Sequence, residues 1–148
     1  MSGHKDLKVF QMAYRLALEI FRLTKTFPLE ERYSLTDQIR RSSRSVAVNI
    51  AEGYRKRQYP KAFVNKLSDS DGEATETQIW LEFSRDCGYL SLEICQRLLS
   101  EYEEVGRMLG GIILHPEKFT PRQQTNCRLL LPSAPAYCRC RLPLPTAK

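Results

Sequence analysis

Apolar residues recur at steps of three and four along most of the first 115 residues. This spacing places side chains on one face of an α-helix. We predict helices over about residues 8–27, 34–57, 60–86 and 92–115, while no segment shows the alternation typical of a strand. Four helices of about 20 residues with short connections predict an all-α fold, an antiparallel up-down four-helix bundle.

Residues with strong positional preferences mark the ends of these helices. Pro28 cannot continue the first helix, and Pro60 suits the first turn of the third. Ser34 and Ser91 are good N-cap residues for the second and fourth helices. Gly88 is suited to the position just after the third helix, where a left-handed backbone is common.

Each predicted helix has one seam of residues that we expect in the core. The seams are Val9, Ala13, Leu16, Ile20, Leu23 and Phe27; Leu35, Ile39, Val46, Ile50 and Tyr54; Phe63, Leu67, Ser70, Ala74, Thr77, Leu81 and Ser84; and Cys95, Leu98, Tyr102, Val105, Leu109 and Ile112. The third seam is small and polar in its middle, so it packs closely but buries little. We therefore expect the third helix to gain stability from further contacts.

The composition changes near residue 118. Residues 1–118 form the predicted bundle, whereas residues 119–148 hold five of the eight prolines and five basic residues but no acidic residue. We expect this Pro-rich basic tail to be disordered or loosely attached.

Bulk properties exclude several classes of protein. A chain of 148 residues suits one domain, and its longest apolar run is far too short to cross a bilayer. The first residues do not resemble a cleavable signal, so we expect a cytoplasmic protein without a membrane partner. The five cysteines include no C-x-x-C pair, which favours reduced thiols over a metal site.

Sequence patterns of catalysis are also missing. Nucleophile motifs, phosphate loops and zinc-binding helix motifs do not occur, and the only histidines are His4 and His115. Asp69, Glu73 and Glu76 share one helix face, but a two-metal bundle site also needs Glu-x-x-His partners. A solvated face, or one that meets a basic neighbour, fits these carboxylates better. We predict a non-enzymatic protein with no catalytic residue, metal or cofactor.

The charges are polarised along the chain. Residues 1–57 carry twelve Lys or Arg and six Asp or Glu, whereas residues 58–118 carry six and eleven. Phosphate binding requires several cations on one surface, and arginine suits bidentate contacts. The predicted nucleic-acid-binding residues, from the first helix and from the second helix and its end, are Lys8, Arg15, Arg22, Arg40, Arg41, Arg44, Arg55, Lys56 and Arg57. The acidic half of a neighbouring subunit could bind the same cations, so both interpretations remain open.

Three residues at the edge of the second helix's seam have structural interpretations. Asn49 and Gly53 lie where a small residue would let another helix approach closely, and we expect Asn49 to be a satisfied polar group at a helix contact. Glu52 is positioned to pair with Arg55 and Lys56 within its own helix.

Several separated blocks resemble one bacterial family. They are D-L-K-V-F-Q-M-A-Y at residues 6–14, L-T-D-Q-I-R-R-S at 35–42, V-N-I-A-E-G at 48–53, E-A-T-E-T-Q-I-W-L at 73–81 and D-C-G-Y-L-S at 86–91. Over residues 5–115 the chain is similar to the four-helix-bundle proteins encoded within 23S rRNA intervening sequences. The accessory variability protein of diversity-generating retroelements is a relative of that family.

The resemblance implies a protomer of a homopentameric, barrel-like ring. In the retroelement relative, a basic surface contacts nucleic acid and a reverse transcriptase. The family's basic positions correspond here to Arg40, Arg41, Arg55, Lys56 and Arg57, and its N-I-A-E-G block supports a structural role for Asn49, Glu52 and Gly53. The sequence departs from the family pattern after about Ile113.

We therefore predict a ring-forming bundle that binds RNA or DNA through phosphates, as an accessory factor to a reverse transcriptase or to a fragmented rRNA. The alternative is a protein-interaction scaffold whose basic half contacts neighbouring subunits or a partner protein.

Overall fold

A computed structural model describes residues 3–120 of the chain. Four α-helices, α1 (Lys8–Leu23), α2 (Leu35–Arg55), α3 (Pro60–Asp86) and α4 (Leu92–Leu114), make up most of this part. Short 3₁₀ turns accompany them, and the described residues contain no strand. The all-helical fold class predicted from the sequence is therefore confirmed.

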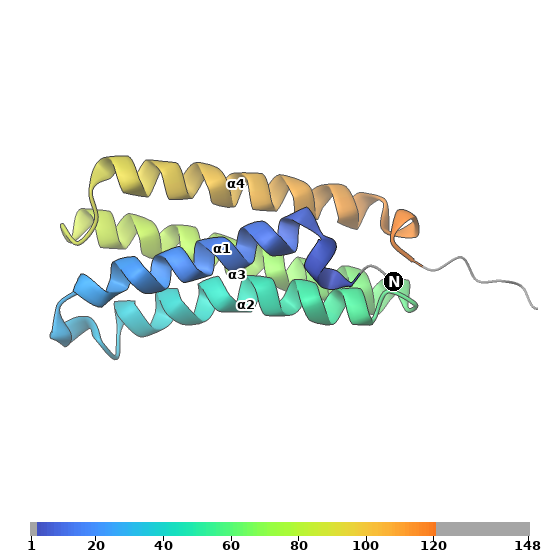
Figure 1. The fold of residues 1–148 in the computed structure, drawn as a ribbon, viewed down its shortest axis with the longest axis horizontal. Coiled ribbons are helices and arrows are strands. Elements are labelled where there is room, and N and C mark those ends of the chain that lie inside the picture. Colours follow the sequence, from blue (N-terminus) through green and yellow to red (C-terminus); the bar gives the residue numbers. More distant parts are fainter. Residues whose placement is uncertain (1–2, 121–148) are drawn as a thin grey trace, which may run out of the picture.

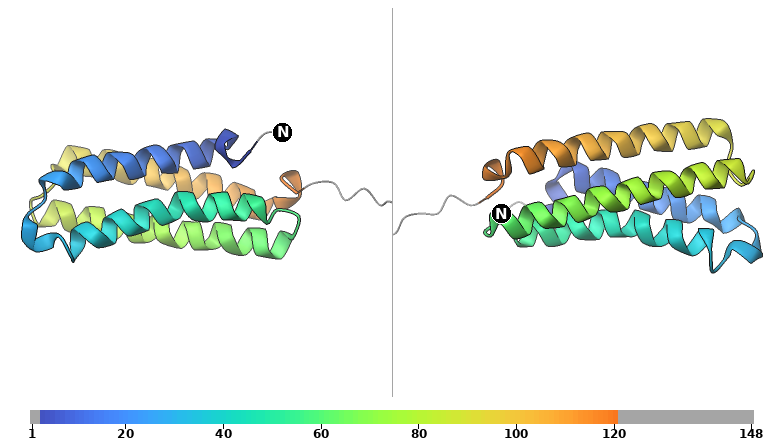
Figure 2. Two further views of the ribbon diagram at one scale, coloured as in Figure 1. Left: turned by 60° about the horizontal axis from the view of Figure 1, so that its bottom comes forward. Right: turned by 180° about the vertical axis from the view of Figure 1, so that it is seen from behind.

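The four helices lie alongside one another as a bundle (Figures 1 and 2). Helix α2 packs against α1 and α3, and α4 packs against α3 and, less extensively, α1. The connections α1–α2 and α3–α4 lie at one end of the bundle, and the α2–α3 connection lies at the other (Figure 1).

The core contains the predicted seams. Every seam residue is buried except Leu23 and Tyr54, which are half-buried. Leu16, Ile39, Val46, Leu81 and Leu98 are among the side chains with no measurable exposure. The periodicity of the sequence thus identifies the core on all four helices.

Two helix boundaries differ from the sequence prediction. Helix α1 ends at Leu23 rather than near residue 27, because the chain tightens into a 3₁₀ turn at Thr24–Thr26. The Thr24 hydroxyl donates to the carbonyl oxygen of Ile20 at 2.8 Å, a side-chain contact that accompanies such tightening. Helix α2 ends at Arg55, two residues earlier than predicted.

The predicted capping residues behave differently from one another. Ser91 caps α4, with its hydroxyl oxygen accepting from the Ile94 N–H at 3.3 Å. Ser34 makes no such bond, because its hydroxyl donates to the Glu31 carboxylate, which itself accepts from the first N–H of α2. Gly88 has a positive φ of 79° after α3, as predicted.

Helices α2 and α3 approach closely through small side chains. A Cβ added at Gly53 would lie 3.2 Å from Cβ of Lys66, so glycine sets the spacing there. The Ser70 hydroxyl donates to the Val46 carbonyl oxygen at 2.9 Å, and Thr77 donates to the Ser42 hydroxyl at 2.9 Å. Hydroxyl groups therefore replace large apolar contacts along the middle of α3.

The described chain ends against the bundle. Phe119 packs against the core, with its ring centroid 6.4 Å from that of Phe63. The rest of the predicted tail, residues 121–148, lies outside the described residues. None of the helices in the described part is long and apolar enough to cross a membrane.

Candidate nucleic-acid interface

Three cations surround one aromatic ring where α1 approaches the start of α2. Phe21 is half-buried on α1, and its ring centroid lies 5.0 Å from Lys25 Nζ, 5.1 Å from Arg40 Cζ and 5.6 Å from Arg44 Cζ. The Arg40 Nε–H also donates to Thr24 Oγ1 at 2.7 Å, which fixes its guanidinium beside the ring. We call Lys25, Arg40 and Arg44 around Phe21 the Phe21 cluster.

No carboxylate in residues 3–120 forms an ion pair with a cation of the Phe21 cluster. Cation–π contact offsets only part of the repulsion between cations held so close together. The cluster therefore keeps positive charge that no carboxylate of the described residues balances through an ion pair. Lys25 was not among the sequence-predicted residues, although it follows Phe21 by four residues, the spacing of neighbours on one helix face.

The other predicted cations of α2 lie in two further places. Arg41 is exposed and close enough to Glu73 of α3 to affect its titration: partial burial and the charge of Glu76 raise the pKa of Glu73, and Arg41 opposes that rise. Arg55 and Lys56 are exposed at the far end of α2 and make no ion pair with the described residues. Arg57 lies over the Tyr54 ring at 4.2 Å and donates to the Tyr54 carbonyl oxygen at 2.9 Å.

The predicted cations of α1 face a different neighbour. Arg15 binds Glu101 of α4, and Arg97 of α4 binds Glu19 of α1 in return. Lys8 lines a cavity of about 420 Å³ together with Met108 of α4. The structure therefore does not bring Lys8 and Arg15 together with the cations of α2.

Arg22 lies seven residues after Arg15, on the same stripe of α1, and is exposed in the last turn of that helix. Its position places it beside the α4-facing stripe rather than on the α2 side of α1. Of the nine sequence-predicted cations, only Arg40 and Arg44 thus share one cluster.

The three structural-motif residues of α2 meet α3 at a single lysine. The Lys66 ammonium lies 2.9 Å from Glu52 Oε2 and 3.2 Å from Asn49 Oδ1, and Gly53 touches the stem of the same side chain. The hydrogen bond and charge of Lys66 lower the pKa of Glu52, and the same contact raises the pKa of Lys66. Asn49 and Gly53 lie at this helix contact, and Glu52 forms its ion pair with Lys66 of α3 rather than with Arg55 or Lys56, although the charge of Lys56 also lowers the pKa of Glu52.

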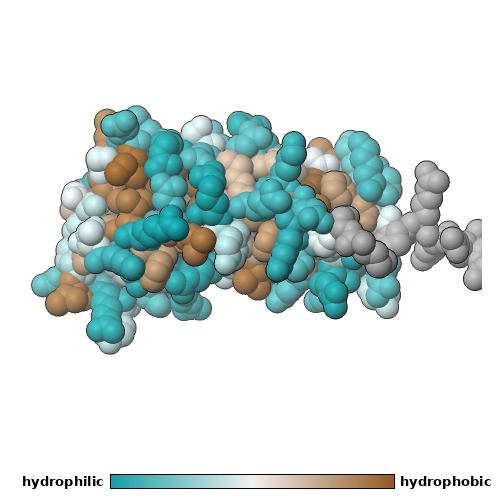
Figure 3. All heavy atoms as spheres, viewed as in Figure 1, coloured by the Kyte–Doolittle hydropathy of each residue, from teal (hydrophilic) through white to brown (hydrophobic). Residues whose placement is uncertain are grey.

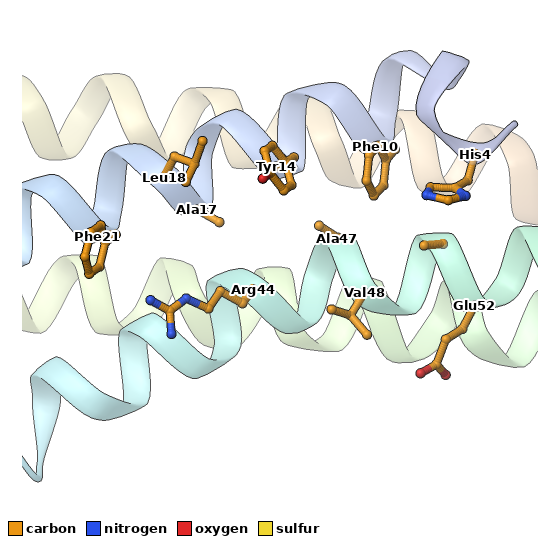
Figure 4. A pocket seen from close by; sticks show the side chains of 11 residues that line it. His4, Phe10, Tyr14, Ala17, Leu18, Phe21, Arg44, Ala47, Val48 and Glu52 are labelled. Carbon is orange, nitrogen blue, oxygen red and sulfur yellow. The ribbon is translucent and has the colours of Figure 1, made fainter.

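An apolar groove of about 600 Å³ runs between α1 and α2 (Figure 4). Its walls are Phe10, Tyr14, Leu18 and Phe21 of α1 and Val48 of α2, with Arg44 at one end. Figure 3 shows apolar surface between hydrophilic side chains on this face of the molecule.

Sequence reasoning missed this groove. Its signal was present as a second stripe on α1, at Phe10, Tyr14 and Leu18, beside the core seam. Tyr14 is 53% exposed and Val48 is 53% exposed, so these side chains do not belong to the core of a single bundle.

The described residues include no group of three or more His, Cys, Asp or Glu that could hold a metal ion. Asp69, Glu73 and Glu76 instead border a surface hollow that Lys66 and Asn49 also line.

Fold and site together define a helical bundle with cations along α2 and an apolar groove between α1 and α2. Residues 5–111 match the family model described as 23S rRNA-intervening sequence protein, and the chain belongs to this family. A crystal structure of a protein of unknown function from the S23 ribosomal protein family of Bacteroides thetaiotaomicron is 29% identical, with a TM-score of 0.65. The match covers 72% of this chain and 95% of that one. The curated proteins gave no match.

Proposed function

We propose that this protein is a non-enzymatic, cytoplasmic bundle that assembles into a homopentameric ring and binds RNA or DNA through phosphate groups. Each copy is an up-down protomer, and the cations of α2 and of the Phe21 cluster provide the binding surface.

One contrast within the molecule carries this proposal. In the acidic half, four of the six cations form an ion pair with a carboxylate: Lys66, Arg85, Arg97 and Arg107. The basic residues of α2 and of the turn after α1, by contrast, form no ion pair with any described carboxylate. Cations without a carboxylate partner along one helix can contact phosphate groups, because each phosphate bound releases a counterion.

Contacts to phosphates position a protein on nucleic acid without reading its sequence. The name of the family refers to intervening sequences of 23S rRNA, which makes a fragmented rRNA a natural setting for such binding. An accessory role beside a reverse transcriptase is the setting that the retroelement resemblance implies.

The test compares two double variants that remove the same charge. Arg41→Gln with Arg55→Gln removes two unpaired cations of α2, whereas Arg85→Gln with Arg107→Gln removes two paired cations of α3 and α4. Fluorescence anisotropy with labelled RNA and DNA, over about 50 to 200 mM salt, measures affinity and its salt dependence. We expect the α2 variant to bind at least about tenfold more weakly. Its log–log slope should be shallower by about 0.9 for each duplex phosphate that it no longer neutralises.

An equal loss of affinity for RNA and DNA in both double variants would show that binding depends on net charge alone. That result would refute the assignment of the binding surface to α2. Undiminished binding by the α2 variant would do the same.

The apolar groove favours a second function, a protein-interaction scaffold. In that case the basic residues of α2 contact a neighbouring subunit or partner protein, and Arg41→Gln with Arg55→Gln lowers the assembled mass. Light scattering on the samples used for anisotropy separates the two functions.

A further inference from the structure

One exposed aromatic ring in the described part of the chain has no ring or cation over it. Tyr59 lies in the turn that joins α2 to α3 and is 62% exposed. The other exposed Phe and Tyr side chains of residues 3–120 each contact a ring or a cation; they are Tyr14, Tyr33 and Phe83. No such contact involves Tyr59 in this part of the chain. Its ring can therefore stack on a planar group of another molecule.

Backbone hydrogen bonds fix the position of Tyr59. Its N–H donates to the Lys56 carbonyl oxygen at 2.8 Å, and its carbonyl oxygen accepts from the Phe63 N–H at 2.9 Å. The start of the turn is fixed as well, because Arg57 Nη1 donates to the Tyr54 carbonyl oxygen at 2.9 Å. A ring on a backbone that is already ordered loses little conformational entropy when another molecule binds.

Cations flank this ring along the chain. Residues 54–61, with the sequence Y-R-K-R-Q-Y-P-K, include four basic residues and no acidic residue. Arg55, Lys56 and Lys61 are exposed, and none of them forms an ion pair with a carboxylate of residues 3–120. The turn thus combines an uncovered ring with positive charge, and positive charge attracts phosphate groups.

An open hollow continues from Tyr59 along the first turns of α3. It has a volume of about 320 Å³ and is lined by Pro60, Lys61, Val64 and Asn65. Pro60 and Val64 give the hollow apolar walls, and the exposed amide of Asn65 can both donate and accept hydrogen bonds. A nucleobase has two apolar faces and a hydrogen-bonding edge, so the ring and the hollow suit both of its surfaces.

We propose that the α2–α3 turn binds single-stranded nucleic acid, with one unpaired base stacked on Tyr59 and the neighbouring phosphates at Lys56 and Lys61. This inference rests on the proposed nucleic-acid binding and names its substrate class. Bases in a duplex cover one another's faces, whereas a single strand leaves these faces open to an aromatic side chain. Every base has such a face, so this contact does not depend on the sequence.

The turn lies at the opposite end of the bundle from the α1–α2 connection (Figure 1), and this separation supplies a control. Tyr33 lies in the α1–α2 connection and is 85% exposed, with Arg32 over its ring. Tyr33→Ala therefore removes an exposed tyrosine far from the turn. Tyr59→Ala removes the proposed stacking ring, and Tyr59→Phe keeps it. Circular dichroism verifies that each variant is folded.

Fluorescence anisotropy measures the affinity of each protein for three labelled probes. They are a single strand of about 12 nucleotides, a DNA strand of the same length with abasic sugars in place of nucleotides, and a duplex of the same length. The abasic strand keeps the phosphates and lacks the bases, so it separates stacking from charge. The single strand and the duplex are prepared both as RNA and as DNA.

We expect Tyr59→Ala to bind the single strand about five- to 150-fold more weakly, the loss of one stacked base. The loss should occur with RNA and with DNA, because stacking does not use the 2′-hydroxyl group. Affinity of this variant for the abasic strand and the duplex should stay at the wild-type value. Tyr59→Phe and Tyr33→Ala should bind all probes as wild type does. Lys61→Gln should weaken all probes alike, since phosphate contacts do not depend on the bases.

Three results would overturn the proposal. They are undiminished single-strand affinity in Tyr59→Ala, a loss in that variant that is as large for the abasic strand or the duplex, and an equal loss in Tyr33→Ala. A wild-type protein that binds the abasic strand as tightly as the single strand would reject the stacking site and leave phosphate binding standing. A wild-type protein that binds none of the probes would reject the nucleic-acid function itself.

Discussion

The ammonium group of Lys66 on α3 lies 2.9 Å from a carboxylate oxygen of Glu52 on α2. One residue further along α2, Gly53 leaves room for the stem of the same lysine. The Lys66 side chain therefore contacts three residues of the V-N-I-A-E-G block: Asn49, Glu52 and Gly53. Asn49, Glu52 and Gly53 of this block serve the α2–α3 contact, while Val48 and Ala51 line the groove between α1 and α2.

Enlarging Gly53 should destabilise the bundle. A Cβ there would lie 3.2 Å from Cβ of Lys66 and 3.5 Å from Leu67 Cδ2, so Gly53→Leu must push α2 and α3 apart. We expect a loss of about 1–3 kcal/mol in the free energy of unfolding, measured with urea. Gly111→Ala is the control: a Cβ at Gly111 meets nothing within 4 Å, and alanine should stabilise α4 by up to about 1 kcal/mol. Equal stability of Gly53→Leu and wild type would contradict the close approach.

Acidification should weaken the contact between α1 and α4. Partial burial alone would raise the pKa of Glu101, but hydrogen bonds from Arg15 and Arg97 and their charges lower it below its ordinary value. A carboxyl group with a lowered folded-state pKa stabilises the fold above its unfolded-state pKa, near 4.5, and this stabilisation is lost as the pH falls through the folded-state value.

Thermal unfolding of Glu101→Gln should therefore differ from wild type at pH 7 and converge with it as the pH falls well below 4.5. Glu103→Gln, at an exposed residue of the same helix without an ion pair, serves as the control. A stability difference between Glu101→Gln and wild type that is constant across this pH range would refute the linkage.

The buried hydroxyl pair between α2 and α3 should behave as a unit. Thr77 Oγ1 donates to Ser42 Oγ at 2.9 Å, and both residues are buried. Thr77→Val alone should cost about 1–3 kcal/mol, because it leaves the Ser42 hydroxyl without this partner. Adding Ser42→Ala should cost less than the sum of the two single changes, which a double-mutant cycle in urea measures. Strict additivity would show that the hydroxyl contact contributes nothing.

Polyanions should stabilise the bundle through the Phe21 cluster. Lys25, Arg40 and Arg44 lie within 5.0–5.6 Å of one ring centroid, so a bound anion relieves their mutual repulsion. Heparin or RNA should raise the melting temperature at low salt, and this rise should shrink near physiological salt, where the Debye length is about 8 Å. Lys25→Gln should reduce the rise, whereas Arg107→Gln, which removes an ion-paired cation of α4, should leave it unchanged. An equal rise in both variants would contradict a role for the cluster.

Periodicity identified the core well because burial depends on which face of a helix a residue occupies, and sequence spacing determines the face. It could not assign partners across helices. Arg15 followed a regular basic stripe, yet the structure places it against Glu101 of α4. Conversely, Phe10, Tyr14 and Leu18 had the spacing of a seam, but the choice between core and exposed groove depends on how α1 is rotated against α2.

The small side chains between α2 and α3 also have a consequence for assembly. Helix α2 forms one wall of the groove and α3 carries the exposed side chains of Ile79 and Phe83, so the spacing set by Gly53, Ser42 and Ser70 fixes the direction of one surface relative to the other. In an assembly built through these two surfaces, that direction is the turn from each subunit to the next. Packing inside a single bundle would then determine the curvature of the ring, and with it the number of copies at which the ring closes.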